Sequence, residues 1–284
     1  MDDLDDAGEV VLDADFVREG WSRPGFDLSA DAWVVLEGGT GFVAYGQVTR
    51  DGPDLVGSWG VALPTHRGHG IGSSLLDRIE ERASRLLPGT PAPRFRHSIN
   101  AGDRPAAAML RARGLRPVRH FWHMGIDLEG PVEPGPTPWA IDIDGIPADG
   151  LSTVHAVLAE AFADDWDYHP DPFDAWAEEQ TTSPSYDPTL WLLATENGGT
   201  PVGAVTAGVL GDRGWVGELG VLASHRGRGI GAALLRRSFA SFASRGLARV
   251  MLNVDAENPT GATALYERVG MRVVKRWDLW ERSP

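Results

Sequence analysis

Apolar residues in the second half of the chain alternate between strand-like and helix-like spacing. Residues 190–210 hold two apolar blocks on either side of Asn197-Gly198-Gly199, which predicts two strands joined by a tight turn. Residues 215–222 form a third apolar block that runs into a group of glycines. The spacing then becomes helical, with apolar side chains at Ile230, Leu234, Leu235, Phe239 and Phe242. The sequence therefore predicts three strands followed by an amphipathic helix.

The flanking segments complete one domain. We expect a strand at residues 248–255, a short helix at 259–270 that Gly270 ends, and a closing strand at 271–280. Upstream, two helices are expected at 151–163 and 172–180. The order βααβββαβαβ indicates an α/β domain built around a mixed, mostly antiparallel sheet flanked by helices.

The first half repeats this pattern. "THRGHGIGSSL" at residues 65–75 matches "SHRGRGIGAAL" at residues 224–234, and the segments around both follow one order, which indicates an internal duplication. The stretch "LEGPVEPGPTP", residues 128–138, lies between the copies and has the composition of a linker. We therefore expect a first domain at 1–128, a linker at 129–138 and a second domain at 139–284.

The first copy is shorter than the second at its beginning. About 21 residues that precede the arginine-glycine motif in the second copy have no counterpart in the first. An opening strand and much of a first helix are expected to be missing. That loss leaves a sheet edge or cleft wall to be replaced, from the other domain or by self-association into a homodimer.

Composition narrows the class of protein. A length of 284 residues fits two domains, and 42% hydrophobic with 23% charged residues is ordinary for a globular chain. No apolar run reaches the roughly 18 residues that a membrane span needs, and the acidic start does not resemble a secretory signal, so the cytoplasm is the expected location. The absence of cysteine excludes disulfides, thiolate ligands and a cysteine nucleophile.

Charge is strongly negative and unevenly distributed. A net charge of −14 argues against nucleic-acid binding, which needs a basic face. No lysine or arginine occurs from residue 120 to residue 212, and residues 160–180 interleave carboxylates with the aromatic residues Phe162, Trp166, Tyr168, Phe173 and Trp176. This composition suits a cationic ligand, and a solvated acidic face over an aromatic core stays an equal alternative.

The repeated glycine turn predicts an anion site. A strand followed by glycines at a helix start presents unpaired N–H groups and the positive end of the helix dipole, which suits phosphate. Arg226 and Arg228 can add charge-assisted hydrogen bonds. A nucleotide P-loop is excluded because the only lysine is Lys275. A simple tight turn and a dinucleotide-binding turn, G-x-G-x-x-A at residues 227–232, stay as alternatives.

Two motifs of the second copy resemble one family. Residues 226–231, Arg-Gly-Arg-Gly-Ile-Gly, resemble the R/Q-x-x-G-x-G/A coenzyme A pyrophosphate loop of the GNAT superfamily of N-acyltransferases. "NPTGATALYERVGM", residues 258–271, resembles the later helix of that superfamily. The match covers nearly all of residues 139–284 and, with degeneration, residues 1–128. The tandem layout is similar to that of mycothiol synthase-like double-domain acetyltransferases of actinobacteria.

The resemblance implies two tandem GNAT-type domains and an enzyme that moves an acetyl group from acetyl-CoA to a primary amine. In this family the third and fourth strands splay apart around the thioester. The main chain of Leu219 and Val221 would contact the pantetheine arm, and one N–H would polarise the thioester carbonyl. Asn258 would bond the cofactor near its pantetheine end. The pyrophosphate would lie on Arg226, Gly227, Arg228, Gly229, Ile230 and Gly231.

The resemblance also implies an acid and a base. Tyr266 matches the position of the group that protonates the thiolate; the alternative is a buried aromatic with a satisfied hydroxyl. Glu218, on the strand before the loop, is the candidate base for the amine proton, directly or through water, and an exposed or ion-paired strand residue is the alternative.

The first copy lacks both groups. Alignment on the arginines puts Trp59 opposite Glu218, and alignment on the later glycines puts Leu110 opposite Tyr266. Arg67, Gly68, Gly70 and Gly72 remain, so the first domain is expected to be noncatalytic and is left as a candidate for binding CoA.

The sequence also bears on a metal site and on a noncatalytic role. Histidines at positions 66, 69, 120, 123, 155, 169 and 225 show no metal-ligand spacing, so no metal is assigned. A noncatalytic acyl-CoA sensor or scaffold is the alternative to transfer. The acceptor expected for transfer is a small or peptide-like cationic amine.

Overall fold

The computed structural model describes residues 3–4, 10–12, 14–90 and 92–282, and the chain divides into two compact units. Unit 1 comprises Met1–Ala14, Gly25–Phe121 and Lys275–Pro284. Unit 2 comprises Asp15–Pro24 and Trp122–Val274. Among the described residues, no helix is long and apolar enough to cross a membrane.

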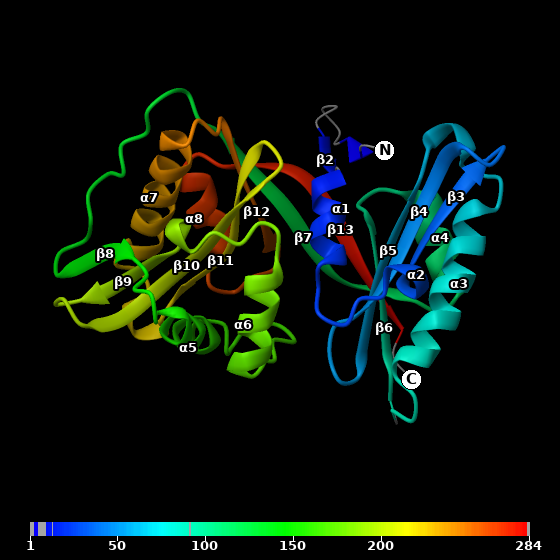
Figure 1. The fold of residues 1–284 in the computed structure, drawn as a ribbon, viewed down its shortest axis with the longest axis horizontal. Coiled ribbons are helices and arrows are strands. Elements are labelled where there is room, and N and C mark those ends of the chain that lie inside the picture. Colours follow the sequence, from blue (N-terminus) through cyan, green and yellow to red (C-terminus); the bar gives the residue numbers. More distant parts are fainter. Residues whose placement is uncertain (1–2, 5–9, 13, 91, 283–284) are drawn as a thin grey trace. The chain divides into compact units, whose positions relative to one another are not determined.

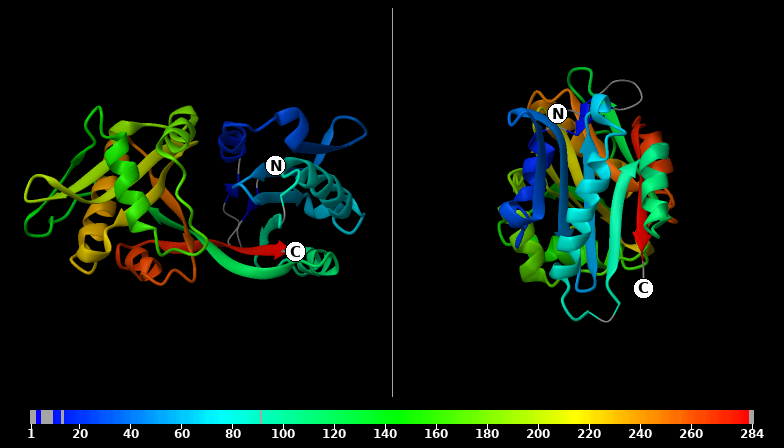
Figure 2. Two further views of the ribbon diagram at one scale, coloured as in Figure 1. Left: turned by 90° about the horizontal axis from the view of Figure 1, so that it is seen from below. Right: turned by 90° about the vertical axis from the view of Figure 1, so that its right-hand side faces the viewer.

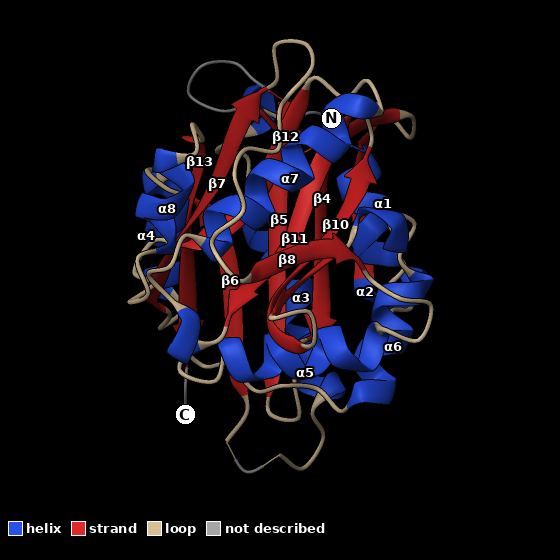
Figure 3. Ribbon diagram, turned by 90° about the vertical axis from the view of Figure 1, so that its left-hand side faces the viewer, coloured by secondary structure: helices blue, strands red, loops and turns tan. Residues whose placement is uncertain are grey.

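Unit 2 has the predicted element order (Figure 1). Its elements are β8 (Ile141–Gly145), α5 (Leu151–Ala161), α6 (Phe173–Thr182), β9 (Leu192–Glu196), β10 (Thr200–Leu210), β11 (Arg213–Val221), α7 (Ile230–Ser244), β12 (Arg249–Asp255) and α8 (Ala262–Arg268). Strands β8 to β11 pair antiparallel in chain order, and β11 pairs with β12 in parallel. Figure 3 views this unit from its β8 edge. The predicted α/β fold with a mixed sheet is confirmed.

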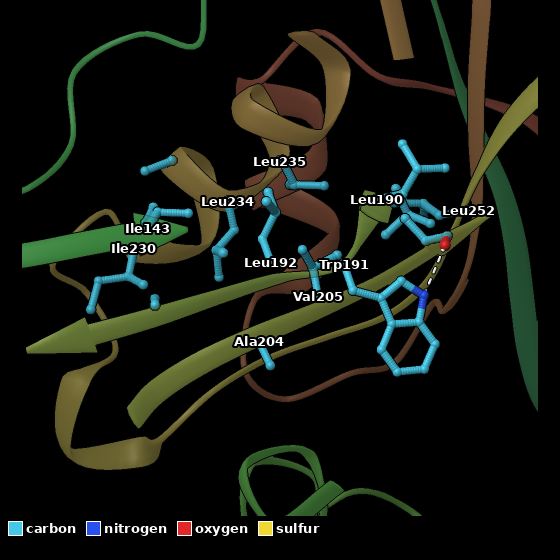
Figure 4. Close-up of a cluster of buried hydrophobic side chains, with 14 of the residues drawn as sticks. Ile143, Leu190, Trp191, Leu192, Ala204, Val205, Ile230, Leu234, Leu235 and Leu252 are labelled. Atoms are coloured by element: carbon cyan, nitrogen blue, oxygen red, sulfur yellow. Dashed lines mark hydrogen bonds between the residues drawn. The ribbon is translucent and has the colours of Figure 1, made fainter. Parts of the chain in front are cut away.

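Helix α7 covers one face of the unit 2 sheet with the side chains that its spacing predicts. Ile230, Leu234 and Leu235 are buried above β10, as Figure 4 shows. In the same core the indole N–H of Trp191 donates to the Ala207 carbonyl at 2.9 Å. Each of these apolar side chains contributes about 1.5–3 kcal/mol by leaving water. Phe242 packs on Gly214, so Phe242→Ala is expected to cost about 3–5 kcal/mol.

Helix α5 covers the opposite face. A Cβ on Gly220 of β11 would lie 2.8 Å from the Cβ of Ala161, so glycine permits the helix to approach the strand that carries the candidate site. The N-terminal helix α1 (Ala14–Trp21) also contributes to this unit from Asp15 on. The ring of Phe16 packs edge-on against Trp215 at a centroid distance of 6.2 Å.

Unit 1 has the same order of elements as unit 2 from β9 onward. Its sheet includes β3 (Ala32–Glu37), β4 (Gly41–Arg50), β5 (Leu55–Ala62) and β6 (Arg94–Asn100), with helices α3 (Ile71–Leu86) and α4 (Arg104–Ala112). Helix α3 lies against the sheet, as the right-hand view of Figure 2 shows. Before β3, the described residues of this unit form the short pair β1 (Asp3–Leu4) and β2 (Val10–Leu12) and the four-residue helix α2 (Leu28–Asp31). Unit 2 has two longer helices, α5 and α6, at that stage of its order.

The last strands of the two copies exchange units. Strand β7 (Arg116–Asp127) begins in unit 1 and enters unit 2 at Trp122, and β13 (Arg272–Arg282) begins in unit 2 and enters unit 1 at Lys275. Residues 277–282 pair antiparallel with β6. The cores explain the exchange, because Met124 of β7 is buried in the unit 2 core and Trp280 of β13 in the unit 1 core.

The division of the chain therefore differs from the predicted boundaries at three segments. Residues 122–128 and 15–24 lie in unit 2, whereas residues 275–284 lie in unit 1. The predicted linker, residues 129–138, has no helix or strand and is counted with unit 2. The closing strand 271–280 exists as β13, but its second half completes the sheet of unit 1 and not that of unit 2.

Candidate active site

The two glycine turns have the same main-chain geometry. A short 3-10 turn, η1 (Pro64–His66) or η3 (Ala223–His225), follows the strand in each copy. The φ angles of Gly68 and Gly70 are 79° and 80°, and those of Gly227 and Gly229 are 77° and 84°. Glycine is needed at these positions because other residues rarely adopt positive φ. Gly70 and Gly229 stand at the N-caps of α3 and α7, so the free N–H groups of both helices are available to an anion.

The space outside the turns is open. A Cβ at Gly68, Gly70 or Gly227 would meet no atom within 4 Å. Gly231 is different, since its Cβ would lie 3.0 Å from a methyl carbon of Leu265 on α8, so this glycine serves close packing. Both turns offer main-chain N–H donors and open space, as the pyrophosphate of a CoA molecule would require.

The two arginines of the second turn have partners within unit 2. The Arg226 side chain donates to the Val221 carbonyl at 3.1 Å and to the Ala161 carbonyl at 2.6 Å, which fixes the end of β11 to the end of α5. Arg228 pairs with Glu196 at 2.7 Å and holds the pKa of that carboxyl below its usual range. Contact of either arginine with a phosphate stays a prediction, and sequence alone did not foresee these contacts.

Glu218 lies at an irregularity of the β10–β11 pairing. The register is regular from Gly203 to Val205, shifts before Ala207, and continues to Leu210. At the shift the Glu218 N–H donates to the Thr206 hydroxyl oxygen at 2.8 Å. Gly217 is required here, because its Cβ would lie 2.8 Å from the same hydroxyl oxygen. This bulge separates Glu218 from the regular ladder.

Strand β11 parts from β12 at the same level. Parallel pairing runs from Gly214↔Val250 to Val216↔Leu252 and ends there. The main-chain edge of residues 217–221 that faces away from β10 is therefore not paired with β12. Leu219 and Val221, predicted to contact the pantetheine arm, lie on this stretch and pair with β10 on the other side. The splay was expected between the third and fourth strands; it falls between the fourth and fifth, because the third and fourth stay bonded around the bulge.

The Glu218 carboxyl is half-buried and accepts a hydrogen bond from an indole. Burial raises its pKa, a hydrogen bond from Trp176 Nε1 at 3.3 Å lowers it, and the negative charge of Glu179 raises it further. His155, whose ring packs on Trp176 at 5.2 Å, has a lowering effect. A carboxylate with a raised pKa is a better proton acceptor, so this environment suits a general base.

Tyr266 is buried on α8. Burial, with a smaller contribution from the charge of Asp165, raises its pKa to about 12, so the phenol carries its proton at neutral pH. Within the described part of the chain its hydroxyl has no hydrogen-bond partner. A neutral phenol without a competing acceptor is suited to give a proton to a leaving group.

Asp165 and Asn258 connect the acidic loop to the start of α8. The Asn258 side-chain nitrogen donates to Asp165 at 3.2 Å, and its oxygen accepts the Thr260 N–H at 2.8 Å. Burial raises the pKa of Asp165, and the positive charge of Arg226 opposes that rise. Contact of Asn258 with a cofactor stays a prediction.

Sequence reasoning named Tyr168 only as one of the aromatic residues in the acidic stretch and gave it no individual role. Burial, followed by the charges of Glu218 and Asp171, raises its pKa to about 12, so this phenol lies within reach of the charge of the candidate base. Its ring packs against Phe162 at 5.7 Å. The only signal in the sequence was a tyrosine among carboxylates, and that pattern gives no direction for the side chain.

Unit 1 encloses a cavity of about 420 Å³ at its own glycine turn. Arg67, Gly68, Gly70 and Gly72 line one part, and residues of β5, β6, α3, α4 and β13 line the rest. Trp59 and Leu110 stand where unit 2 has Glu218 and Tyr266; Leu110 is fully buried, and Trp59 packs on Tyr45 at 5.1 Å. The cavity has the same glycine turn as unit 2 and lacks the proposed acid and base.

Comparisons with known proteins agree with this geometry. Residues 154–271 match the acetyltransferase (GNAT) family model. The mycothiol acetyltransferase of Cellulomonas flavigena is 32% identical over 259 residues, covering 84% of this chain and 71% of that protein. A GCN5-related N-acetyltransferase from Sphaerobacter thermophilus has a TM-score of 0.83 at 32% identity, covering 98% of this chain and 88% of that one. A tandem GNAT protein from the clavulanic acid biosynthesis pathway shares the fold, with a TM-score of 0.68 at 17% identity over 89% and 82% of the two chains.

Proposed function

This chain belongs to the GNAT family of acetyltransferases, and we propose that unit 2 is its catalytic domain and acetylates a primary amine. The enzyme is an acetyltransferase, and acetyl-CoA is its cosubstrate. The observation that carries the proposal is Glu218, a half-buried carboxyl with a raised pKa at a bulge, where the β11 main chain parts from β12.

The proposed reaction needs two proton transfers. The acceptor ammonium gives one proton to Glu218, which passes it to solvent, and the free amine attacks the thioester carbonyl carbon. A C–N bond forms and the C–S bond breaks, while a main-chain N–H of Leu219 or Val221 stabilises the charge on the carbonyl oxygen. Tyr266 protonates the CoA thiolate and recovers its proton from the amide nitrogen. The products are the N-acetyl compound, CoA and one released proton.

The cofactor site extends from β11 to the turn. Residues 226–231 are proposed to hold the pyrophosphate by main-chain N–H groups at the start of α7, and Asn258 is proposed to bond the pantetheine arm. The contacts of Arg226 with two carbonyls support a positioning role for this side chain, since they fix the strand end from which the turn departs.

The acceptor is proposed to be a small or peptide-like cationic amine. Three residues of the acidic and aromatic stretch act on Glu218: Trp176 donates a hydrogen bond to it, and Glu179 and Tyr168 lie within reach of its charge. The name of the curated relatives associates them with mycothiol. For this chain we propose only a cationic amine as acceptor. Acidic and aromatic surroundings favour a positive charge and do not specify one molecule.

Unit 1 is proposed to hold a CoA-type ligand without turning it over. Its turn repeats the main-chain angles of the catalytic turn and opens on a cavity, which supports binding. Trp59 and Leu110 provide no proton acceptor or donor suited to the transfer, which supports the absence of catalysis.

Self-association into a homodimer is also proposed. Strand β3 is an edge strand of the sheet, and Val34, Leu36 and Phe42 on β3 and β4 are exposed. A molar mass that rises with concentration in light scattering, and falls to that of one chain in Val34→Lys, is the expected result.

The first experiment is acetyl-CoA titration followed by a transfer assay. Calorimetry is expected to give two sites per chain. The chain has no cysteine, so a thiol reagent detects only the CoA released and any thiol of the acceptor. Transfer to diamines is expected to exceed transfer to neutral amines and to fall with salt. Equal rates on both classes, insensitive to salt, count against the cationic acceptor.

Matched variants separate the two units. Gly70→Asp and Gly229→Asp each put a carboxylate at a helix N-cap with φ near +80°, at positions with room for a Cβ. Gly229→Asp is expected to abolish most transfer and one binding site, and Gly70→Asp to remove the other site and spare transfer. The reverse pattern would assign catalysis to unit 1.

A further inference from the structure

The cavity of unit 1 has two chemically different ends. At one end lie Gly68 and Gly70, whose turn exposes main-chain N–H groups at the start of α3. The cavity then follows β5 from Ala62 back to Trp59, and His97 of β6 also lines it. A strand rises about 3.3 Å per residue, so this stretch is roughly 10 Å long before the turn is added. An extended ligand with a phosphate at one end fits this shape.

The ring of His97 has a fixed orientation. The Ser58 hydroxyl lies 2.7 Å from the Arg96 carbonyl oxygen and 2.8 Å from His97 Nδ1. The Arg96 carbonyl oxygen can only accept a hydrogen bond, so the one hydroxyl proton of Ser58 must point to it. The Ser58 oxygen is then the acceptor toward His97, so Nδ1 carries a proton and donates it. Nε2 is then the unprotonated nitrogen, and it lies on the ring edge away from Ser58.

The ring is neutral as well as oriented. Burial lowers the pKa of His97 to about 4, so the imidazole carries no charge near pH 7. Within the described part of the chain, Nε2 has no hydrogen-bond partner, and His97 is among the residues that line the cavity. The cavity therefore presents a nitrogen that can accept a hydrogen bond and cannot donate one.

Unit 2 has no equivalent group. Strand β12, which follows α7 as β6 follows α3, reads Arg-Val-Met-Leu-Asn-Val-Asp and contains no histidine. Ser58 also stands at the position of Gly217, the glycine of the catalytic bulge. The pair of Ser58 and His97 is thus particular to unit 1 and has no part in the proposed transfer.

We propose that the unit 1 cavity selects coenzyme A with a free thiol over its acetyl thioester, through a hydrogen bond from the S–H group to Nε2 of His97. This inference rests on the proposed binding of a CoA-type ligand by the unit 1 turn. Free CoA is the product of transfer in unit 2, so the cavity is a product site.

The selectivity follows from the donor and acceptor balance. A thiol has one proton to donate, whereas the thioester end of acetyl-CoA has a carbonyl oxygen and a sulfur and no donor. Acetyl-CoA would therefore bury Nε2 without a partner, which costs more than the modest gain of a made hydrogen bond. We expect free CoA to bind unit 1 about tenfold more tightly than acetyl-CoA.

Calorimetry on Gly229→Asp tests this at one site, with CoA, acetyl-CoA and S-methyl-CoA as ligands. The expected order is CoA first, with acetyl-CoA and S-methyl-CoA similar to each other and about tenfold weaker. S-methyl-CoA lacks the donor and is smaller than acetyl-CoA, so it separates hydrogen bonding from size. Equal binding of CoA and S-methyl-CoA overturns the inference. Binding of none of the three at this site overturns instead the proposed cofactor-holding role of unit 1.

Variants of the pair add a second test in the same background. His97→Leu removes the acceptor and is expected to make the affinities for CoA and S-methyl-CoA equal. Ser58→Ala frees the ring orientation and is expected to reduce the preference. His120→Gln, at an exposed histidine that pairs with Asp278, is the control and is expected to keep the tenfold difference. A preference that persists in folded His97→Leu contradicts the proposal.

Discussion

Units 1 and 2 share a turn and differ in the strand that leads into it. The two glycine turns agree within a few degrees in φ, and each ends at a helix N-cap. In unit 1, β4 and β5 pair without interruption from Ala44↔Ala62 to Arg50↔Val56, whereas the β10–β11 ladder of unit 2 shifts beside Glu218. Main-chain N–H groups do not depend on side-chain identity, so the proposed phosphate site is kept in both units, whereas the proposed proton-transfer groups occur only in unit 2.

Three positions account for the difference in the strands. Thr206, Gly217 and Glu218 form the bulge of unit 2, and Gln47, Ser58 and Trp59 occupy the aligned positions of unit 1. The parallel pairing of β5 with β6 reaches Trp59, while that of β11 with β12 stops before Glu218. The two copies therefore differ in one strand pair: β5 and β6 stay paired up to Trp59 in unit 1, whereas β11 and β12 separate before Glu218 in unit 2.

The largest expected effect is on catalysis. Glu218→Gln and Tyr266→Phe are each expected to lower kcat by about 10²–10³, because each removes one proton-transfer group. Steady-state assays with saturating acetyl-CoA measure this. Leu110→Met changes the unit 1 counterpart of Tyr266 at similar volume and is expected to leave kcat unchanged. Full activity in both unit 2 variants, with activity lost on substitution of Arg67 and Gly70, would falsify the assignment of catalysis to unit 2.

The next effect concerns acid stability of unit 1. The pKa of His97 is about 4 when folded, against 6.5 for an unperturbed histidine, so between these values the unfolded chain binds more protons. Stability from this group is complete above pH 6.5 and falls by about 3 kcal/mol as pH drops to 4. Urea unfolding of His97→Leu across this range is expected to show a flatter pH dependence than that of the parent. Identical slopes for the His97 variant and the parent contradict the prediction.

A smaller effect tests the bulge itself. Thr206→Val leaves the Glu218 N–H without its acceptor and is expected to cost about 1–3 kcal/mol and to lower kcat. Gln47→Met in unit 1 removes the acceptor of the Tyr45 hydroxyl and is expected to cost a similar amount without a change in kcat. Denaturant unfolding and the transfer assay measure both, and equal loss of kcat in the two variants contradicts a special role for the bulge.

The smallest effect is a shift of the pH profile. The hydrogen bond from Trp176 lowers the pKa of Glu218, so Trp176→Phe is expected to raise it. The base must be ionised, so the acid limb of kcat/KM moves to higher pH in this variant. A profile that moves to lower pH or stays in place argues that Glu218 is not the titrating base. His120→Gln again provides the control.

Much of the fold was predictable because it depends on local sequence features, namely the spacing of apolar residues and the glycines at helix ends. Ile230, Leu234 and Phe239 fix the helix by their spacing, and Gly229 and Gly270 mark its start and the end of the next helix. Glu218 was found from its place before the turn. The bulge that exposes it depends on contact with Thr206, twelve residues away on another strand, and spacing does not reveal such register shifts.

The exchange of the last strands could not be predicted from either strand alone. Both β7 and β13 are long and partly apolar after a glycine, so both satisfy the pattern of a closing strand. Which sheet each joins is decided by where Met124 and Trp280 find a core. His97 was missed for a related reason, since a histidine within a strand forms no motif and its meaning comes from Ser58 and the cavity.

The exchanged strands also determine the order in which the two sheets can be completed during synthesis on the ribosome. Strand β6 ends at Asn100, and the partner that covers its second edge ends at Arg282, about 180 residues later. At about 5–20 residues per second, translation leaves that edge without its native neighbour for roughly 10–40 s. Unit 2 receives its borrowed strand before its own sheet is made. The part of the protein that emerges first is therefore the part completed last, by the final residues of the chain.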